Sequence, residues 1–229
     1  MTLRFGFLVF PGMQQLDMTG PYEVFASTAG AEVVLIWKNR APVMTATKLP
    51  ITPTATFEDC PPLDVICIPG GSGVNALMED GEVLDFVRAK AIHARYLTSV
   101  CSGALVLGAA GLIKGRRAAT HWYAHDFLAA FGAIPVDARI VEDGKVITAG
   151  GVTSGIDFGL TVVARLLGQA EAETVQLQLE YAPAPPFNSG TPAQASPDVL
   201  ARAKARLQAS RTIREAVVAR VTGSASRVA

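Results

Sequence analysis

The chain has 229 residues, of which 50% are hydrophobic, and its 20 basic residues balance its 20 acidic ones at pH 7. A chain of this length and composition can bury one large core, so we expect a single domain over residues 1–229. The absence of long charge runs and of any apolar stretch near the roughly 20 residues that span a bilayer argues against nucleic acid and membranes as partners.

Short apolar runs rich in Val, Ile and Leu alternate with longer helical patterns along the chain. We expect strands at 4–10, 32–37, 64–68, 96–100 and 145–148, and helices at 16–27, 73–93, 102–110, 122–131 and 154–167. Continuous apolar runs indicate strands that are buried on both faces, as in a parallel sheet. Strand alternating with helix therefore predicts an α/β fold, with a doubly wound, mainly parallel sheet sandwiched by helices.

The remaining segments form an insertion and a C-terminal extension. Residues 42–54 look like a β-hairpin inserted after the second strand, and 171–181 form another helical pattern. Residues 182–197 are rich in proline, which forbids helix and favours an extended strap. A final amphipathic helix is expected at 197–222.

The three cysteines are an odd number, and their spacing matches no zinc-binding pattern. No small-residue cleavage site follows the apolar run at the N-terminus, so the sequence predicts a cytoplasmic protein with free thiols. Cys67 lies in the middle of a predicted strand and is expected to be buried and inert. Cys60 lies in a loop beside two prolines and is expected to be exposed.

Cys101 follows the predicted strand 96–100 immediately and precedes the predicted helix 102–110. Ligands of an open parallel sheet bind beyond the carboxyl ends of its strands, where such strand-turn-helix elbows lie. Gly103 allows the backbone to pass close beneath the thiol. A helix N-terminus favours the thiolate, which makes Cys101 the candidate nucleophile. The alternative is a small buried hydrophobic side chain.

A glycine-rich turn at residues 68–73 leaves the third strand, which should neighbour the strand that ends at Cys101. Glycines let backbone N–H groups approach a ligand closely, as an oxyanion hole requires. We expect the N–H groups of Gly71 and Ser102 to stabilise developing negative charge. The alternative is a purely structural turn.

Asp17 is the single acidic residue in the apolar stretch 16–21, near the start of the first helix. One interpretation is a helix cap or a partner of the helix dipole. The other is a general acid/base, because a carboxyl held against a thiol in an apolar cleft has a raised pKa and can move protons near neutral pH.

Several motifs together resemble the DJ-1/PfpI superfamily and, within it, the isocyanide hydratase branch. The resemblance covers nearly the whole chain and rests on residues 7–12, 16–25, 69–71, 100–103, 120–122 and 176–188, of which the last is specific to the branch. It implies a flavodoxin-like fold related to class I glutamine amidotransferases, and a homodimer. It also implies Cys101 as nucleophile and Asp17 as its acidic partner.

Departures from the relatives narrow this interpretation. Protease-like members carry a histidine after the nucleophile, so Ser102 disfavours peptidase and amidotransferase chemistry, while it keeps the hydroxyl of the threonine expected in the hydratase branch. His121 is expected at the rim of the site, in packing and hydrogen bonding, with catalysis as the alternative. Gly150 should allow close approach behind the elbow. His93 and His125 are expected on helix surfaces.

The resemblance implies hydration of a small apolar isocyanide, R–N≡C, by water to an N-formamide. Cys101 would add to the terminal carbon to give a thioimidate, with Asp17 as proton donor and acceptor. This chemistry needs no metal or organic cofactor. Two alternatives stay open: a DJ-1-like redox sensor or glyoxal-processing enzyme with the same Cys101, and a regulatory module. The short C-terminal extension argues against the regulator, since it leaves no room for a helix-turn-helix domain.

Overall fold

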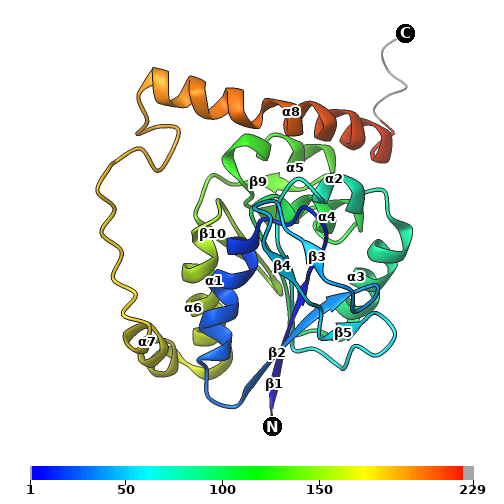
Figure 1. Cartoon of the computed structure of the whole chain (residues 1–229), viewed down its shortest axis with the longest axis vertical. Coiled ribbons are helices and arrows are strands. Elements are labelled where there is room, and N and C mark those ends of the chain that lie inside the picture. Colours follow the sequence, from blue (N-terminus) through cyan, green and yellow to red (C-terminus); the bar gives the residue numbers. More distant parts are fainter. Residues whose placement is uncertain (1, 224–229) are drawn as a thin grey trace.

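The computed structural model describes residues 2–223, and its centre is a seven-stranded sheet (Figure 1). The strands lie in the order β10-β11-β7-β6-β1-β2-β5, and every pairing is parallel except that of β10 with β11. The fold prediction is therefore confirmed. The strands are β1 (Leu3–Leu8), β2 (Ala31–Trp37), β5 (Ala55–Thr56), β6 (Val65–Ile68), β7 (Tyr96–Val100), β10 (Ile140–Asp143) and β11 (Val146–Ala149).

The order of the strands reverses beside β1. The chain moves from β1 to β2 on one side and then returns to β6 on the other, so the crossovers run in opposite directions. Right-handed crossovers place the helices of the two halves on opposite faces. α1 (Gln15–Ala26) packs on α6 (Ser154–Leu167), and α3 (Gly81–His93) packs on α4 (Ala104–Ala109). A ligand crevice is expected beyond the carboxyl ends of β1 and β6.

Aromatic rings fix the helix α1 against the sheet. Phe5 of β1 stacks on Phe25 of α1 with ring centroids 4.1 Å apart, and Phe25 meets the edge of Phe158 from α6. All three side chains are buried. Because each such ring removes a large apolar area from water, the position of α1 is strongly specified.

The C-terminal part of the chain crosses from one end of the molecule to the other (Figure 1). After α7 (Gln169–Gln178), an extended segment runs to Ser196, whose hydroxyl accepts a hydrogen bond from the Val199 N–H. The helix α8 (Pro197–Val221) follows and lies against three short elements, α2 (Val74–Leu77), α5 (Phe127–Ala130) and η2 (Trp122–Ala124). Its range agrees with the predicted 197–222, and it covers the end of the molecule where the glycine-rich turn lies.

Two predicted helices are broken in the structure. The predicted helix 73–93 divides into α2 (Val74–Leu77) and α3, because the Asp80 side chain accepts a hydrogen bond from the Val83 N–H and starts a new helix. The predicted helix 122–131 consists of η2 (Trp122–Ala124) and α5 (Phe127–Ala130).

The smaller elements complete the fold. The predicted hairpin at 42–54 is present as β3 (Val43–Met44) and β4 (Pro50–Ile51). The helix after Cys101 begins with the 3-10 turn η1 (Cys101–Gly103). The sequence prediction missed β5, β10, β8 (Arg117–Ala118) and β9 (Ile134–Pro135), which are short or polar and show no buried-strand pattern.

Candidate active site

Cys101 lies at a strained turn beyond the end of β7. Its φ is +56°, in the left-handed region that non-glycine residues rarely adopt. The Cys101 N–H donates to the Gly150 carbonyl at 2.8 Å, and the Thr120 hydroxyl donates to the Cys101 carbonyl at 2.7 Å. A Cβ on Gly103 would lie 1.9 Å from the Ile68 carbonyl oxygen, so this turn requires glycine. The elbow is thus fixed from both neighbouring strands.

Asp17 is fully buried in the first turn of α1. Its Oδ2 accepts a hydrogen bond from the Gly70 N–H at 2.8 Å, while its Oδ1 has no hydrogen-bond partner among residues 2–223. The side chain caps no N–H group of its own helix, so the helix-cap interpretation is wrong. Burial raises the pKa of Asp17 from 3.8 to about 7, although the Gly70 N–H and the neighbouring Cys101 thiol lower it in part.

The Cys101 thiol is buried beside this carboxyl. Burial, followed by the charge of Asp17, raises the pKa of the thiol well above its usual range. The Ser102 N–H and the Arg214 charge favour the thiolate. The sequence argument that the helix N-terminus favours the thiolate is therefore correct in sign, but burial outweighs it. Thiol and carboxyl titrate as a coupled pair that retains a proton near neutral pH.

A cavity of about 240 Å³ opens above the thiol. Of the predicted site residues, Cys101, Ser102, Gly71 and His121 line it. Asp17 and Gly150 are not in the lining; they contact the elbow and its neighbouring turn from the interior. Two further lining residues, Tyr123 and Arg214, come from η2 and α8. The cavity thus lies beyond the carboxyl end of the sheet and beneath the C-terminal helix.

The glycine-rich turn pairs with the loop that follows β1. The Gln14 N–H donates to the Gly70 carbonyl at 2.8 Å, and Met13 forms a bridge with Gly71. A Cβ on Gly70 would lie 2.6 Å from the Ser102 nitrogen. These contacts bring the turn after β6, the loop after β1 and the elbow after β7 together at one edge, because β6 lies between β1 and β7; the expected pairing of β6 with β7 is confirmed.

The Gly71 N–H, one of the two expected oxyanion donors, is engaged within the protein. It donates to the Ser102 hydroxyl oxygen at 3.1 Å, and that hydroxyl lies 3.4 Å from the Gly71 carbonyl oxygen. Donation from Gly71 to a substrate anion therefore requires the Ser102 hydroxyl to move. The Ser102 N–H already acts on the Cys101 sulfur.

His121 lies at the cavity wall just before η2. Its Nδ1 accepts a hydrogen bond from the Tyr123 N–H at 3.2 Å, and its ring lies against Trp122. Burial and the Arg214 charge lower the pKa of His121 from 6.5 to about 4, so the ring is neutral at pH 7. His93 is exposed as expected, whereas His125 is half-buried with its Nε2 enclosed and without a hydrogen-bond partner among residues 2–223.

The other two cysteines lie outside the cavity. Cys67 is buried in β6, and burial raises its pKa to about 12, which confirms it as a packing residue. The prediction of an exposed Cys60 is wrong. Its side chain is only 9% exposed, and Lys90 donates to its backbone carbonyl at 2.8 Å.

Arg214 is the functional candidate that the sequence reasoning missed. It is one of three buried residues of α8, with Val217 and Val218. In the sequence, Arg214 could be expected on the buried face of α8, because Val217 and Val218 follow it three and four residues later. This signal is weak, since α8 carries five further Arg or Lys residues. Only the docking of the helix distinguishes Arg214 from the exposed cations.

Residues 2–223 contain neither a candidate transmembrane helix nor a candidate metal-binding cluster. No helix in this part of the chain is long and apolar enough to cross a membrane. No cluster of three or more His, Cys, Asp or Glu side chains in the same residues has the arrangement of a metal site.

Comparison with known proteins gives a consistent result. The model of the DJ-1/PfpI family matches residues 4–165. Isonitrile hydratase from Pseudomonas putida is 56% identical over 220 residues, which are 96% of each chain. The Parkinson disease protein 7 homolog of Danio rerio is 28% identical over 73% of this chain and 92% of its own. A crystal structure of a ThiJ/PfpI family protein from Pseudomonas syringae has a TM-score of 0.92 at 44% identity, and covers 95% of this chain and 91% of its own.

Proposed function

This chain belongs to the DJ-1/PfpI family, and from that premise we propose that it is an isocyanide hydratase with Cys101 as nucleophile and Asp17 as general acid/base. Its substrates are a small, mainly apolar isocyanide and water, and its product is an N-substituted formamide. We further propose that the protein acts in the cytoplasm as a homodimer.

The observation that carries this proposal is the buried pair of Cys101 and Asp17 beneath the cavity. The Gly70 N–H holds one carboxyl oxygen of Asp17, which leaves Oδ1 without a partner among residues 2–223. A pKa of about 7 lets this carboxyl both accept and donate a proton near neutral pH. Isocyanide hydration needs such a group, since the attacked carbon must also be protonated.

In the first half of the reaction, the sulfur of Cys101 forms a bond to the terminal carbon of R–N≡C. The thiol proton passes to Asp17 and from there to the same carbon. The product is a thioimidate, R–N=CH–S, on Cys101. Asp17 ends this half in the state in which it began, and no electrons are gained or lost.

In the second half, Asp17 takes a proton from water while the water oxygen bonds to the thioimidate carbon. The nitrogen receives that proton, which gives R–NH–CH(OH)–S on Cys101. The carbon–sulfur bond then breaks, the hydroxyl proton returns to sulfur through Asp17, and R–NH–CHO leaves. Atoms and protons balance across the two halves with Cys101 and Asp17 as the reacting side chains.

Turnover of an isocyanide tests the proposal directly. The purified protein should consume cyclohexyl isocyanide, measured as loss of the infrared N≡C band, and Cys101→Ala should abolish the loss. Asp17→Asn should slow it by at least about 100-fold, the usual scale for a general acid/base. Cys60→Ser is the matched control and should keep wild-type activity. Activity in Cys101→Ala would refute the nucleophile, and activity on methylglyoxal instead of the isocyanide would favour the glyoxalase alternative.

A further inference from the structure

Arg214 is a buried cation whose hydrogen bonds within residues 2–223 go to neutral oxygen atoms. The residue is 8% exposed, its Nε donates to the Asn75 Oδ1 at 3.0 Å, and its Nη2 lies 3.5 Å from the Gly71 carbonyl oxygen. Among residues 2–223, no carboxylate forms an ion pair with it. Buried arginines are ordinarily paired, since an uncompensated charge is costly to bury.

The guanidinium shares the cavity with the reactive thiol. Arg214 and Cys101 both line it, and each acts electrostatically on the other. The other cation near Arg214 is Arg211, whose charge repels it and is engaged elsewhere. Among residues 2–223, the Cys101 thiolate is therefore the anion that compensates the charge of Arg214.

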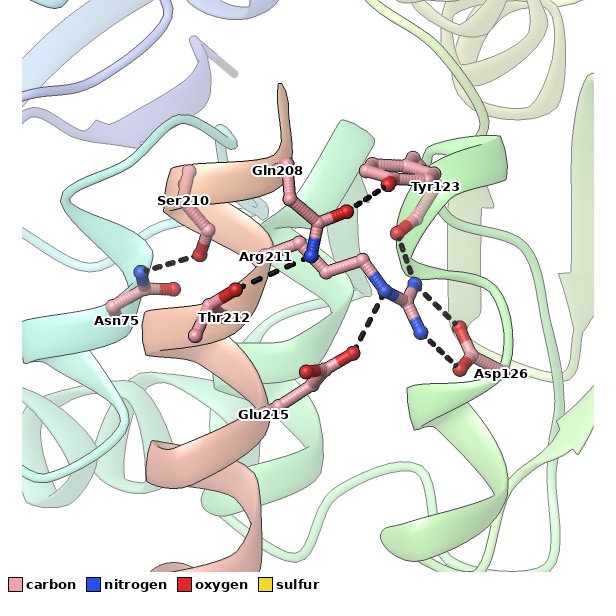
Figure 2. A network of polar contacts seen from close by, with 8 residues as sticks. All are labelled: Asn75, Tyr123, Asp126, Gln208, Ser210, Arg211, Thr212 and Glu215. Atoms are coloured by element: carbon pink, nitrogen blue, oxygen red, sulfur yellow. Dashed lines mark hydrogen bonds and ion pairs between the residues drawn. The ribbon is translucent and has the colours of Figure 1, made fainter. Parts of the chain in front are cut away.

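The docking of α8 fixes the position of this charge. Arg211 forms two hydrogen bonds with the Asp126 carboxylate, at 3.1 and 2.6 Å, and donates to the Tyr123 carbonyl at 2.7 Å (Figure 2). On the other side, Asn75 donates to the Ser210 carbonyl at 3.3 Å (Figure 2). One turn of α8 is thus held between α2 and η2.

We propose that Arg214 is a positioning residue for the reaction: its guanidinium, in the cavity that the thiol also lines, supplies the positive charge that stabilises the thiolate form of Cys101. The inference rests on the proposed function for its effect on turnover. It deepens that function, because the C-terminal helix, which lies outside the family-matched residues 4–165, then completes the active site. The charge favours the thiolate that attacks the isocyanide and the thiolate that leaves as the formamide is released.

The charges of the groups around the Cys101 thiol show how the effect of Arg214 can be measured. Asp17 from α1 opposes ionisation of the thiol, and Arg214 from α8 favours it. His121 is neutral above about pH 4 and contributes no charge near pH 7. A change in the pH dependence of thiol reactivity on substitution of Arg214 therefore reports the loss of its charge.

The test measures the alkylation rate of Cys101 by iodoacetamide between pH 5 and pH 10. Mass spectrometry of the peptide that contains Cys101 distinguishes it from the two other cysteines. Arg214→Met should move the profile to higher pH and slow alkylation at pH 7 by about tenfold, which corresponds to one pKa unit. Arg214→Lys, which keeps the charge, should recover most of the rate. In isocyanide turnover, Arg214→Met should lower kcat more than it changes KM.

Arg206→Met is the matched control, because it removes an exposed cation of the same helix and leaves both the docking of α8 and the charge in the cavity in place. Its alkylation profile should superimpose on that of the wild type. The proposal is overturned if the Arg214→Met profile equals the wild-type profile, if Arg214→Lys is as slow as Arg214→Met, or if Arg206→Met slows alkylation equally. Because alkylation needs no isocyanide, an inactive wild-type enzyme would refute the hydratase proposal without deciding this one.

Discussion

At the scale of single residues, the chemistry depends on how closely the backbone approaches two side chains. Gly70 donates to Asp17 and passes beside Ser102, and Gly103 passes beneath the elbow. The sequence identified Cys101 and Asp17, since a thiol at an elbow and a lone acid in an apolar stretch are local signals. The sequence could not show that Asp17 Oδ1 is buried without a hydrogen-bond partner among residues 2–223, because this depends on the packing of three separate loops.

Gly70→Ala should disrupt the pair of thiol and carboxyl. The added Cβ would lie 2.6 Å from the Ser102 nitrogen and 2.8 Å from the Asp17 Oδ2, distances that force backbone or carboxylate to shift. We expect a loss of about 1–3 kcal/mol in the free energy of unfolding, and at least about tenfold in kcat/KM. Gly81→Ala, at a position with open space, is the control and should change neither. Unchanged kinetics in Gly70→Ala would show that catalysis does not need the close approach of the Gly70 backbone to Ser102 and Asp17.

Burial of Asp17 should make stability depend on pH. Its pKa is about 7 in the folded state and close to 3.8 in the unfolded chain, so the folded state binds more protons between these values. The stabilising contribution is complete below about pH 4 and is lost as the pH rises to about 7, on the order of 4 kcal/mol at most. Urea unfolding of wild type and Asp17→Asn at pH 4, 5.5 and 7 measures it. Parallel pH profiles for the two proteins would contradict a raised pKa.

At the scale of elements, local signals predicted the parallel strands well and the helix boundaries less well. Apolar runs marked β1, β2, β6, β7 and β11, whereas β10 escaped because an antiparallel edge strand that contains Glu142 and Asp143 has no such run. The prediction of one continuous helix over 73–93 was wrong at Asp80. The Asp80 side chain caps the N-terminus of α3, and this hydrogen bond competes with continuation of the helix.

The cap of α3 gives a prediction at this scale. Asp80→Ala removes the acceptor for the Val83 N–H and a partially exposed ion pair with Lys38. We expect a loss of about 1 kcal/mol in the free energy of unfolding, measured by urea denaturation. Asp85→Ala, which removes an exposed carboxylate from the same helix, should cost less than half as much. Equal losses would mean that the charge, and not the cap, matters.

At the scale of the whole molecule, the sheet and its two helix layers place the loops after β1, β6 and β7 at one edge, and α8 covers that edge. The mainly parallel sheet could be predicted from the alternation of strand and helix. The contribution of Arg214 could not, because this residue lies 113 residues beyond Cys101 and reaches the site only through the docking of α8. Local periodicity describes a helix face but not the surface that the face meets.

The aromatic contact between the helices of one layer should contribute strongly to global stability. Phe158→Ala would remove a fully buried ring that meets Phe25 across α1 and α6, at an expected cost of about 3–5 kcal/mol. Phe187→Ala, at a ring that is 79% exposed, should stay within about 0.5 kcal/mol of the wild type. Chemical denaturation of both variants measures the difference. Similar stabilities would show that this contact does not hold the layer together.

Covalent catalysis by Cys101 is tested most directly by the mass of the Cys101 peptide after acid quenching of the enzyme during turnover of an isocyanide. Formation of the thioimidate is an addition, so the peptide should gain the full mass of one isocyanide molecule, and the gain should disappear once the substrate is exhausted. An unmodified Cys101 during rapid turnover, or an adduct on Cys60 with Cys101 unchanged, would contradict covalent catalysis at the elbow.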